Sequence, residues 1–350
     1  MAKKISCLLL VITLILGLLV GCSKQQGTKE TKSIKIGVTL YNQYDTFISE
    51  LISDFKRYAS EKEQETDMSI NMEIYNASDS QSTQNSQVES MINSGCDVIC
   101  VNLVDRTEPT TIIDLAERNN VPIIFFNREL VKEDLERWNK IYYVGAQAFE
   151  SGVLEGELVV DAFKKKESLD KNHDGVCQYI VLEGEAGHQD SIVRTEYSVR
   201  TMTEGGLELE KLGYGIANWN RAQAKTQMVQ LFQRYGNNIE LILANNDDMA
   251  LGAIDALKSI NTSKEDYPAI VGIDGTDVGL DAVRAGDMIG TVYNDKEGQA
   301  LAMLNLAYVI STNGNLDELS LDDGKYKRLS YYKVTMEEAD TYKNRLKPEF

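Results

Sequence analysis

The chain has 350 residues, of which 54 are acidic and 36 are basic, so its formal net charge is −18. This acidic balance excludes nucleic acid as a partner, because phosphate binding requires a basic face, and it also excludes broad electrostatic adhesion to an anionic bilayer. The length exceeds what one ordinary hydrophobic core organises and suits two lobes.

The N-terminus predicts export. Lys3 and Lys4 precede an apolar run from Cys7 to Val20, which matches a signal peptide over residues 1–21 and is short for a membrane span. The run ends in Leu19-Val20-Gly21-Cys22, which resembles the bacterial lipobox. We therefore expect a lipoprotein lipidated at Cys22 and a polar tether over residues 22–33. The alternative is an ordinary signal peptide with a chance cysteine.

Apolar runs of strand length then alternate with segments of helical period. In the first half the predicted strands cover residues 34–40, 72–75, 98–103 and 123–126. Ile48, Leu51, Ile52 and Phe55 share one face of the first predicted helix. In the second half the predicted strands cover residues 178–183, 214–217, 240–244, 269–273 and 288–292. Two such series predict an α/β fold with two doubly wound, parallel-sheet lobes.

Ligands of such folds bind beyond the carboxyl ends of the strands, and polar and aromatic residues gather there. No glycine follows Leu40, as a dinucleotide-binding turn requires, and the chain has neither a P-loop nor a G-x-S-x-G elbow. A pyranose needs flat aromatic rings against its faces and planar polar groups around its hydroxyl rim. Phe47 and Trp219 would supply the rings from opposite lobes, although aromatics after strands are more often core residues.

Ordered motifs across residues 34–335 resemble those of the galactose/glucose-binding proteins, which belong to the type I periplasmic binding proteins. They include Tyr44-Asp-Thr-Phe47, Val121-Pro-Ile-Ile-Phe-Phe-Asn-Arg-Glu129, Gly184-Glu-Ala-Gly-His-Gln-Asp190 and Leu243-Ala-Asn-Asn-Asp247. The resemblance implies an N-terminal lobe of residues 34–145 plus 295–330 and a C-terminal lobe of residues 146–294 plus 331–350. It also implies a three-segment hinge near residues 145–147, 294–296 and 329–332.

The resemblance further implies a sugar site, with Phe47 and Trp219 stacking on the ring. The Asp190–Arg194 pair would meet the anomeric hydroxyl as a bidentate fork, whereas such a pair taken alone reads as a surface salt bridge. Gln189 and Asn220 depart from the family pattern and leave the exact sugar open. The hydroxyl-binding residues would be Asp45, Asn127, His188, Asp190, Arg194, Asn246, Asp274 and Asn294.

A second motif, Asp170 to Gln178, has the oxygen spacing of an EF-hand calcium loop and a glycine at its sixth position. Its twelfth position, Val181, cannot bind a metal, and Asn/Asp/Gly clusters are usually just turns. The resemblance supplies the missing ligand as Glu240 and makes calcium a structural cofactor. The expected ligands are Asp170, Asn172, Asp174, the carbonyl of Val176, Gln178 and Glu240.

These observations predict a monomeric binding protein that captures D-galactose or D-glucose and delivers it to an ABC importer without acting as an enzyme. It would be anchored through its lipid to the outer face of the cytoplasmic membrane. A glycoside-active enzyme using Asp45, Asp190 and Asp274 is the alternative. A transcriptional regulator of the same fold is disfavoured by the secretion signal, and a chemoreceptor-coupled sensor remains open.

Overall fold

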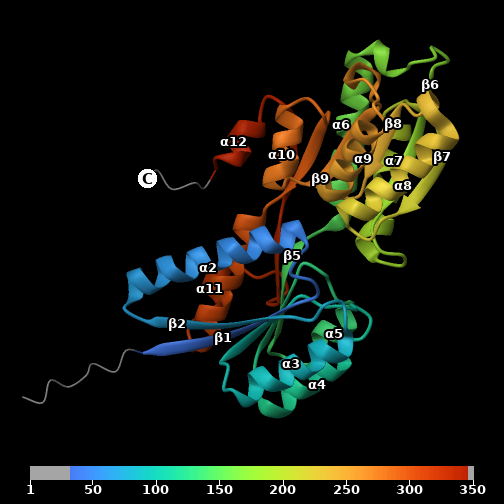
Figure 1. Cartoon of the computed structure of the whole chain (residues 1–350). Helices are drawn as coiled ribbons and strands as arrows, with labels where there is room; N and C mark the ends of the chain where they lie inside the picture. The colour runs from blue at the N-terminus through green and yellow to red at the C-terminus, as the bar shows by residue number, and fades with distance from the viewer. Residues whose placement is uncertain (1–31, 346–350) are drawn as a thin grey trace, which may run out of the picture. The chain divides into compact units, whose positions relative to one another are not determined.

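The structure, a computed structural model, describes residues 32–345. The predicted signal peptide, Cys22 and most of the predicted tether lie outside the described residues. From Ser33 onward the chain forms one compact unit. It contains two six-stranded sheets (Figure 1). We call the sheet that includes β1, with its helices, the first lobe, and the other sheet, with its helices, the second lobe.

The first lobe is a parallel sheet with strand order β11-β5-β4-β3-β1-β2. Helices α2 and α11 pack on one face, and α3, α4 and α5 pack on the other. The strands are β1 (Ser33–Leu40), β2 (Ser69–Asn76), β3 (Val98–Val101), β4 (Ile123–Phe126), β5 (Ile141–Ala146) and β11 (Tyr326–Leu329). The helices are α2 (Thr46–Thr66), α3 (Gln81–Asn93), α4 (Thr110–Asn119), α5 (Lys132–Glu136) and α11 (Lys296–Ser311).

The second lobe repeats this topology with order β12-β10-β9-β8-β6-β7, and only β12 runs antiparallel to its neighbour. Helices α6 and α7 cover one face, and α8, α9, α10 and α12 cover the other. The strands are β6 (Val176–Glu183), β7 (Glu208–Ile216), β8 (Leu241–Ala244), β9 (Ala269–Asp274), β10 (Gly290–Asn294) and β12 (Tyr331–Val334). The helices are α6 (Ala148–Lys165), α7 (Gln189–Glu204), α8 (Arg221–Tyr235), α9 (Asp247–Ser259), α10 (Asp277–Arg284) and α12 (Ala339–Lys343).

Burial explains which runs become central strands. Every residue of β3, β4 and β8 is buried, because a parallel strand inside a doubly wound sheet has helices on both faces. In β8, Leu241 and Leu243 pack toward α6 and α7, while Ile242 and Ala244 pack toward the opposite helices. The edge strands β2 and β7 are mostly half-exposed. The expected two-lobed α/β fold is confirmed.

The chain crosses between the lobes three times, between β5 and α6, between β10 and α11, and between β11 and β12. Many helices begin directly after a strand, with the intervening turn at the carboxyl end of the sheet. In both lobes the strand order reverses beside the first strand, between β1 and β3 and between β6 and β8. The ends of these strands are therefore where ligand-binding side chains belong.

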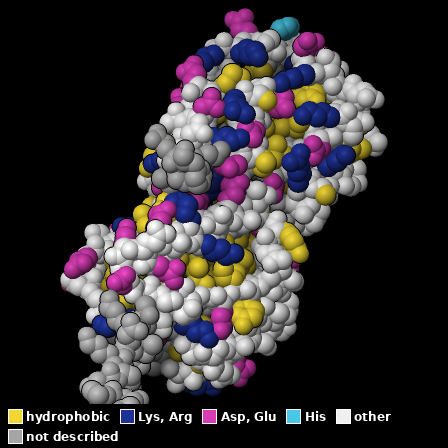
Figure 2. All heavy atoms as spheres, turned by 60° about the vertical axis from the view of Figure 1, so that its left-hand side comes forward, with side chains coloured by type: hydrophobic (Ala, Val, Ile, Leu, Met, Phe, Trp, Pro, Cys, Tyr) yellow, Lys and Arg dark blue, Asp and Glu magenta, His cyan; other side chains and the backbone are white. Residues whose placement is uncertain are grey.

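Acidic and basic side chains are interspersed over the face of the molecule shown in Figure 2, so this face carries no continuous basic stripe. Within residues 32–345, no helix combines the length and the apolar character needed to cross a membrane.

Candidate functional site

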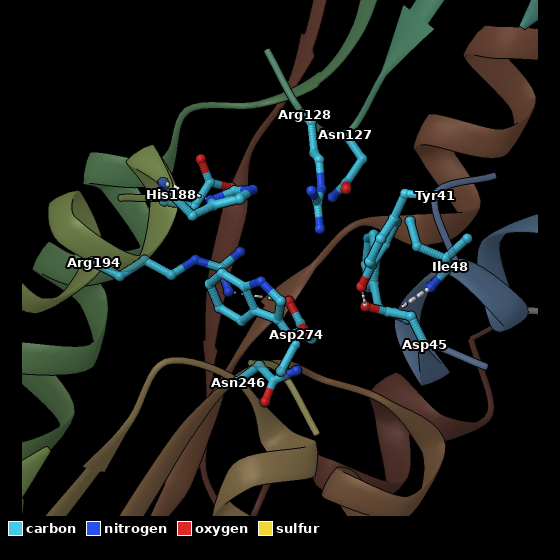
Figure 3. A pocket seen from close by; sticks show the side chains of 12 residues that line it. Tyr41, Asp45, Ile48, Asn127, Arg128, His188, Arg194, Asn246 and Asp274 are labelled. Carbon is cyan, nitrogen blue, oxygen red and sulfur yellow. Dashed lines mark hydrogen bonds and ion pairs between the residues drawn. The ribbon is translucent and has the colours of Figure 1, made fainter. Parts of the chain in front are cut away.

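A cavity lies between the two lobes, at the carboxyl ends of their strands (Figure 3). The empty space that these walls enclose, counting the part that opens to solvent, is about 350 Å³. Three lining residues, Tyr41, Ile48 and Arg128, were not among the predicted sugar ligands. The other lining residues are nine of the ten predicted ones, namely Asp45, Phe47, Asn127, His188, Asp190, Arg194, Trp219, Asn246 and Asp274.

Asp45 enters the cavity from the start of α2, where it is the N-cap. Its Oδ1 accepts a hydrogen bond from the Ile48 backbone N–H at 2.9 Å. Its Oδ2 accepts one from the Tyr41 hydroxyl, which comes from the end of β1 (Figure 3). Both carboxylate oxygens therefore have a fixed direction, and each keeps a lone pair for a ligand hydroxyl.

Asn127 and Arg128 follow β4 and point toward the cavity (Figure 3). Asn127 has a left-handed backbone with φ 62°, a conformation that asparagine tolerates better than most residues. Its Oδ1 accepts a hydrogen bond from the Asn102 amide at 3.1 Å. This bond uses one lone pair of the side-chain oxygen, and the amide NH₂ of Asn127 can donate to a ligand.

His188 faces these residues from the second lobe, as the N-cap of α7. Its Nδ1 accepts the Asp190 backbone N–H at 3.1 Å, which assigns the ring proton to Nε2 when the imidazole is neutral. Burial lowers the pKa of His188 to about 4, against a smaller opposing effect of Asp190. At neutral pH the ring is therefore an uncharged donor through Nε2.

Arg194 is buried one turn further along α7. Its guanidinium lies 3.6 Å from Asp274 Oδ1 and donates to the Asn245 carbonyl at 2.7 Å. Its ion-pair partner is thus Asp274 rather than Asp190, and the predicted Asp190–Arg194 fork is not the pair that the structure shows. The arginine side chain extends to the ends of β8 and β9, where Asn245 and Asp274 hold it. Burial raises the pKa of the Asp274 carboxyl well above its usual value, and Arg194 opposes this rise.

Two aromatic side chains line the cavity. Phe47 is 4% exposed and packs in the core of the first lobe, so it serves the core and the cavity wall together. Trp219 follows β7 with φ 60° and meets the His188 ring edge-on at a centroid distance of 5.2 Å. A Cβ on Gly184 would lie 2.2 Å from the indole. The indole fits in this position because residue 184 is a glycine and has no Cβ.

The floor of the cavity in the second lobe is formed by Asn246 and Asp274. Asn246 is the N-cap of α9, and its Oδ1 accepts the Met249 backbone N–H at 2.9 Å. Asp274 has φ 119°, a backbone strain that proteins retain mainly at functional sites. Both side chains are nearly buried and polar, an arrangement suited to hydroxyl groups.

Asn294, the tenth predicted residue, does not line the cavity. It is 2% exposed at the end of β10, and its Oδ1 accepts a hydrogen bond from Gln299 at 2.6 Å. Asn294 lies at the end of a strand, where ligand-binding residues were expected, but its amide oxygen accepts a hydrogen bond from Gln299 of α11. Of the three additional residues, Arg128 had a sequence signal, because it is a charged residue directly after a buried strand.

The predicted calcium loop lies at the start of β6 in the second lobe. Asp174 Oδ2 accepts amide hydrogen bonds from Asn172 and Gln178 at 3.0 and 2.9 Å. The two oxygens of Glu240 accept the backbone N–H groups of Lys171 and Gln178 at 2.5 and 3.2 Å.

Asp170 has one carboxylate oxygen bonded to a backbone N–H, while the other, Oδ1, is buried without a partner. A buried, unpartnered carboxylate oxygen is what an oxygen-ligated cation would satisfy. In the described part of the chain, no group of three or more His, Cys, Asp or Glu side chains is arranged to hold a metal ion. The oxygen donor set fits calcium in kind, although its acidic members do not converge.

Comparison with known proteins gives the family. The model of the periplasmic binding protein domain matches residues 36–315. A D-galactose/methyl-galactoside binding periplasmic protein of Haemophilus influenzae is 34% identical over 274 residues, which cover 78% of this chain and 80% of the relative. A xylitol-binding protein of Mycolicibacterium smegmatis is 30% identical over 273 residues, which cover 78% of this chain and 71% of that protein.

A solved structure shares the fold. An ABC transporter solute binding protein of Bacillus halodurans, with bound myo-inositol, superposes with a TM-score of 0.74 at 26% identity, and the match covers 91% of this chain and all of that one. The family model and the relatives together cover both lobes and the cavity between them. The chain therefore belongs to the periplasmic binding protein domain family.

Proposed function

We propose that this chain is the sugar-binding component of an ABC importer and that it captures D-galactose or D-glucose in the cavity between its lobes. The observation that carries the proposal is the lining of the cavity, where two aromatic side chains and a set of fixed polar groups come together from both lobes. The relatives are named for binding D-galactose and xylitol, and the solved structure holds myo-inositol. All three ligands are small and carry several hydroxyls, which supports a ligand of this class.

In this proposal Trp219 and Phe47 lie against the apolar faces of the pyranose, and the polar side chains meet its rim. Carboxylates accept hydrogen bonds from the hydroxyl groups, while the Asn127 amide and His188 Nε2 donate hydrogen bonds to hydroxyl oxygens. Arg194, whose guanidinium lies 3.6 Å from Asp274, donates to hydroxyl oxygens. A ring hydroxyl, which is donor and acceptor together, then finds both partners.

The transport step requires the two lobes to separate and close around the ligand. The three crossing segments are short, as expected of a hinge that changes few backbone angles. The closed form, which joins surfaces of both lobes, would be the form that the permease recognises. A chemoreceptor is a second partner that such a form could serve.

We propose that the sugar leaves unchanged. Two of the three cavity carboxylates are engaged in the fold, since Asp45 caps α2 and Asp274 faces Arg194. Glycoside hydrolysis needs one carboxyl as acid and another as base or nucleophile at the anomeric carbon. These engaged carboxylates support binding over the enzymatic alternative.

We also propose that the loop Asp170–Gln178 and Glu240 hold a calcium ion with a structural role. The buried Asp170 Oδ1 without a partner supports this site, and an ion would replace the amide hydrogen bonds that Asp174 now accepts. When bound, the ion would supply charge to a set of carboxylate, amide and carbonyl oxygens. The ion would hold the loop against Glu240, which directly precedes β8 and so lies at the amino end of that strand.

We propose, finally, that Cys22 is lipidated and anchors the protein at the outer face of the cytoplasmic membrane. A Cys22→Ala protein should then leave the membrane fraction while keeping its ligand affinity. Recovery of the unsubstituted protein without lipid would contradict this part of the proposal.

The test of the sugar site is calorimetric titration with a panel of monosaccharides. D-galactose or D-glucose should bind at a ratio of one with a Kd of about 1 μM or lower, which corresponds to at least ~8 kcal/mol. Trp219→Ala should weaken binding, whereas Tyr214→Ala, an exposed aromatic on the neighbouring edge strand, should leave it unchanged. A preference for a pentose, or steady product release from a glycoside, would refute the proposal.

A further inference from the structure

A second hollow adjoins the inner cavity. It is larger and opens to solvent, with about 950 Å³ of empty space when its open side is counted. Tyr41, Asp45, Arg128 and Trp219 line both hollows and form the boundary between them. The remaining residues of this outer chamber are Asn42, Tyr44, Asp79, Val104, Glu185, Asn218, Asn220, Gln223 and Asp248.

Arg128 is held at this boundary by contacts with both lobes. Its Nη2 lies 2.6 Å from Glu185 Oε1, and its Nη1 lies 3.3 Å from Glu185 Oε2, so the pair is bidentate. Nη1 also donates to the Val104 carbonyl at 2.6 Å, and the guanidinium lies 3.8 Å from the Tyr41 ring centroid. Arg128 follows β4 of the first lobe and Glu185 follows β6 of the second, so the ion pair bridges the lobes.

The energetics make this pair hard to displace. Arg128 is only 5% exposed, whereas the Glu185 side chain is 33% exposed and reaches the pair from the chamber side. A buried guanidinium that loses its carboxylate partner keeps its desolvation penalty without the compensating attraction. A ligand that extends from the inner cavity into the outer chamber passes the boundary that Arg128 lines, with Glu185 on its outer side.

We propose that the Arg128–Glu185 pair is the specificity-determining wall that limits the ligand to a single ring. This inference rests on the proposed sugar-binding function and deepens it. The wall exists only when the lobes are together, because its two halves belong to different lobes. A free monosaccharide fits behind it, and a sugar that carries a second ring on the side of the outer chamber does not.

The test compares D-galactose and D-glucose with disaccharides in which a second ring is attached at position 1, 4 or 6. The full-length protein should bind the monosaccharide about 100-fold or more tightly than the disaccharide whose second ring is directed at the outer chamber, since that ring would leave a buried charge unpaired. In Glu185→Ala the ratio should fall by at least about tenfold for one linkage, the one directed at the outer chamber. Glu185→Gln keeps the shape of the wall and removes the charge of its carboxylate. Its ratio of monosaccharide to disaccharide affinity should lie between those of the unsubstituted protein and Glu185→Ala.

Gln223→Ala is the matched control, because Gln223 lines the outer chamber and is not part of the wall. The ratio of monosaccharide to disaccharide affinity in Gln223→Ala should equal that of the unsubstituted protein. The inference is overturned if the unsubstituted protein binds all of the disaccharides nearly as tightly as the monosaccharide. It is also overturned if both Glu185 variants, shown to be folded by thermal melting, keep the original ratio. Either result leaves monosaccharide binding standing, whereas absence of monosaccharide binding would refute the proposed function itself.

Discussion

Gly184→Ala tests whether the position of one aromatic ring controls affinity. Gly184 follows β6, and Trp219 follows the adjacent strand β7. A Cβ at position 184 would lie 2.2 Å from Cζ2, 2.3 Å from Cη2 and 2.4 Å from Cε2 of the indole. Gly184 is not one of the glycines with a positive φ, so its backbone does not have a left-handed conformation. Alanine therefore meets the ring and has no separate backbone penalty.

The size of the effect follows from these distances. Ordinary contacts of a Cβ begin near 3.4 Å, so the indole must move by more than about 1 Å or rotate out of the cavity. A displacement of about 1 Å at a site can cost up to ~100-fold. We expect Gly184→Ala to weaken sugar binding by ~10–100-fold, equivalent to about 1.4–2.8 kcal/mol, with a smaller loss of stability because Trp219 is only partly buried.

Calorimetric titration of a double-mutant cycle checks this reasoning. In a Trp219→Ala background the alanine at position 184 has no ring to displace, so it should cause little further loss. Gly95→Ala is the control, since Gly95 has φ 79° and open space around it and should lose about 1 kcal/mol of stability without losing affinity. Wild-type affinity in Gly184→Ala, or an equal loss in both backgrounds, would refute the reasoning.

Three further results are expected. Burial raises the pKa of Glu155 to about 8, so native stability should fall as pH rises from about 4.5 to 8. Thermal melting should show that Glu155→Gln is more stable than wild type at pH 9 and similarly stable at pH 4. Burial lowers the pKa of His188 to about 4, so the free energy of unfolding should fall by up to ~3 kcal/mol as pH falls from about 6.5 to 4. Denaturant titrations should show a weaker dependence of this free energy on pH in His188→Asn. A chelator should lower the Tm of the wild type and leave that of Glu240→Gln nearly unmoved, because a metal bound only to the native state stabilises it; an unmoved wild-type curve would show that the loop is only a turn.

The central strands were readable from the sequence because burial on both faces leaves a continuous apolar run. The edge strand β7 begins at Glu208, yet the sequence predicted only residues 214–217, since Glu208, Glu210 and Lys211 on a half-exposed edge carry no apolar signal. The strands β11 (YKRL) and β12 (YYKV) are four residues long and contain Lys or Arg. Their pairing depends on β5 and β10, which lie far away in the chain, so no local pattern reveals it.

The candidate site was predictable to the extent that strand ends converge. That rule, together with the family motifs, placed Asp45, His188 and Asn246 correctly in the cavity wall. It could not give the direction of a side chain, and Asn294 turns into α11 instead. The Arg194–Asp274 ion pair spans 80 residues of sequence, so no local spacing could reveal it.

A physical reason connects the fold with the site. Asp45, His188 and Asn246 are all N-caps, and each uses one side-chain acceptor on a backbone N–H of its own helix. The cap bond fixes the side chain before a ligand arrives, so less conformational entropy is lost on binding. The same bond couples stability to recognition, because truncation of a cap costs about 0.5–2 kcal/mol of stability. Asn127 and Trp219 line the cavity and cap no helix, so replacing either of them changes the cavity wall without removing a helix cap.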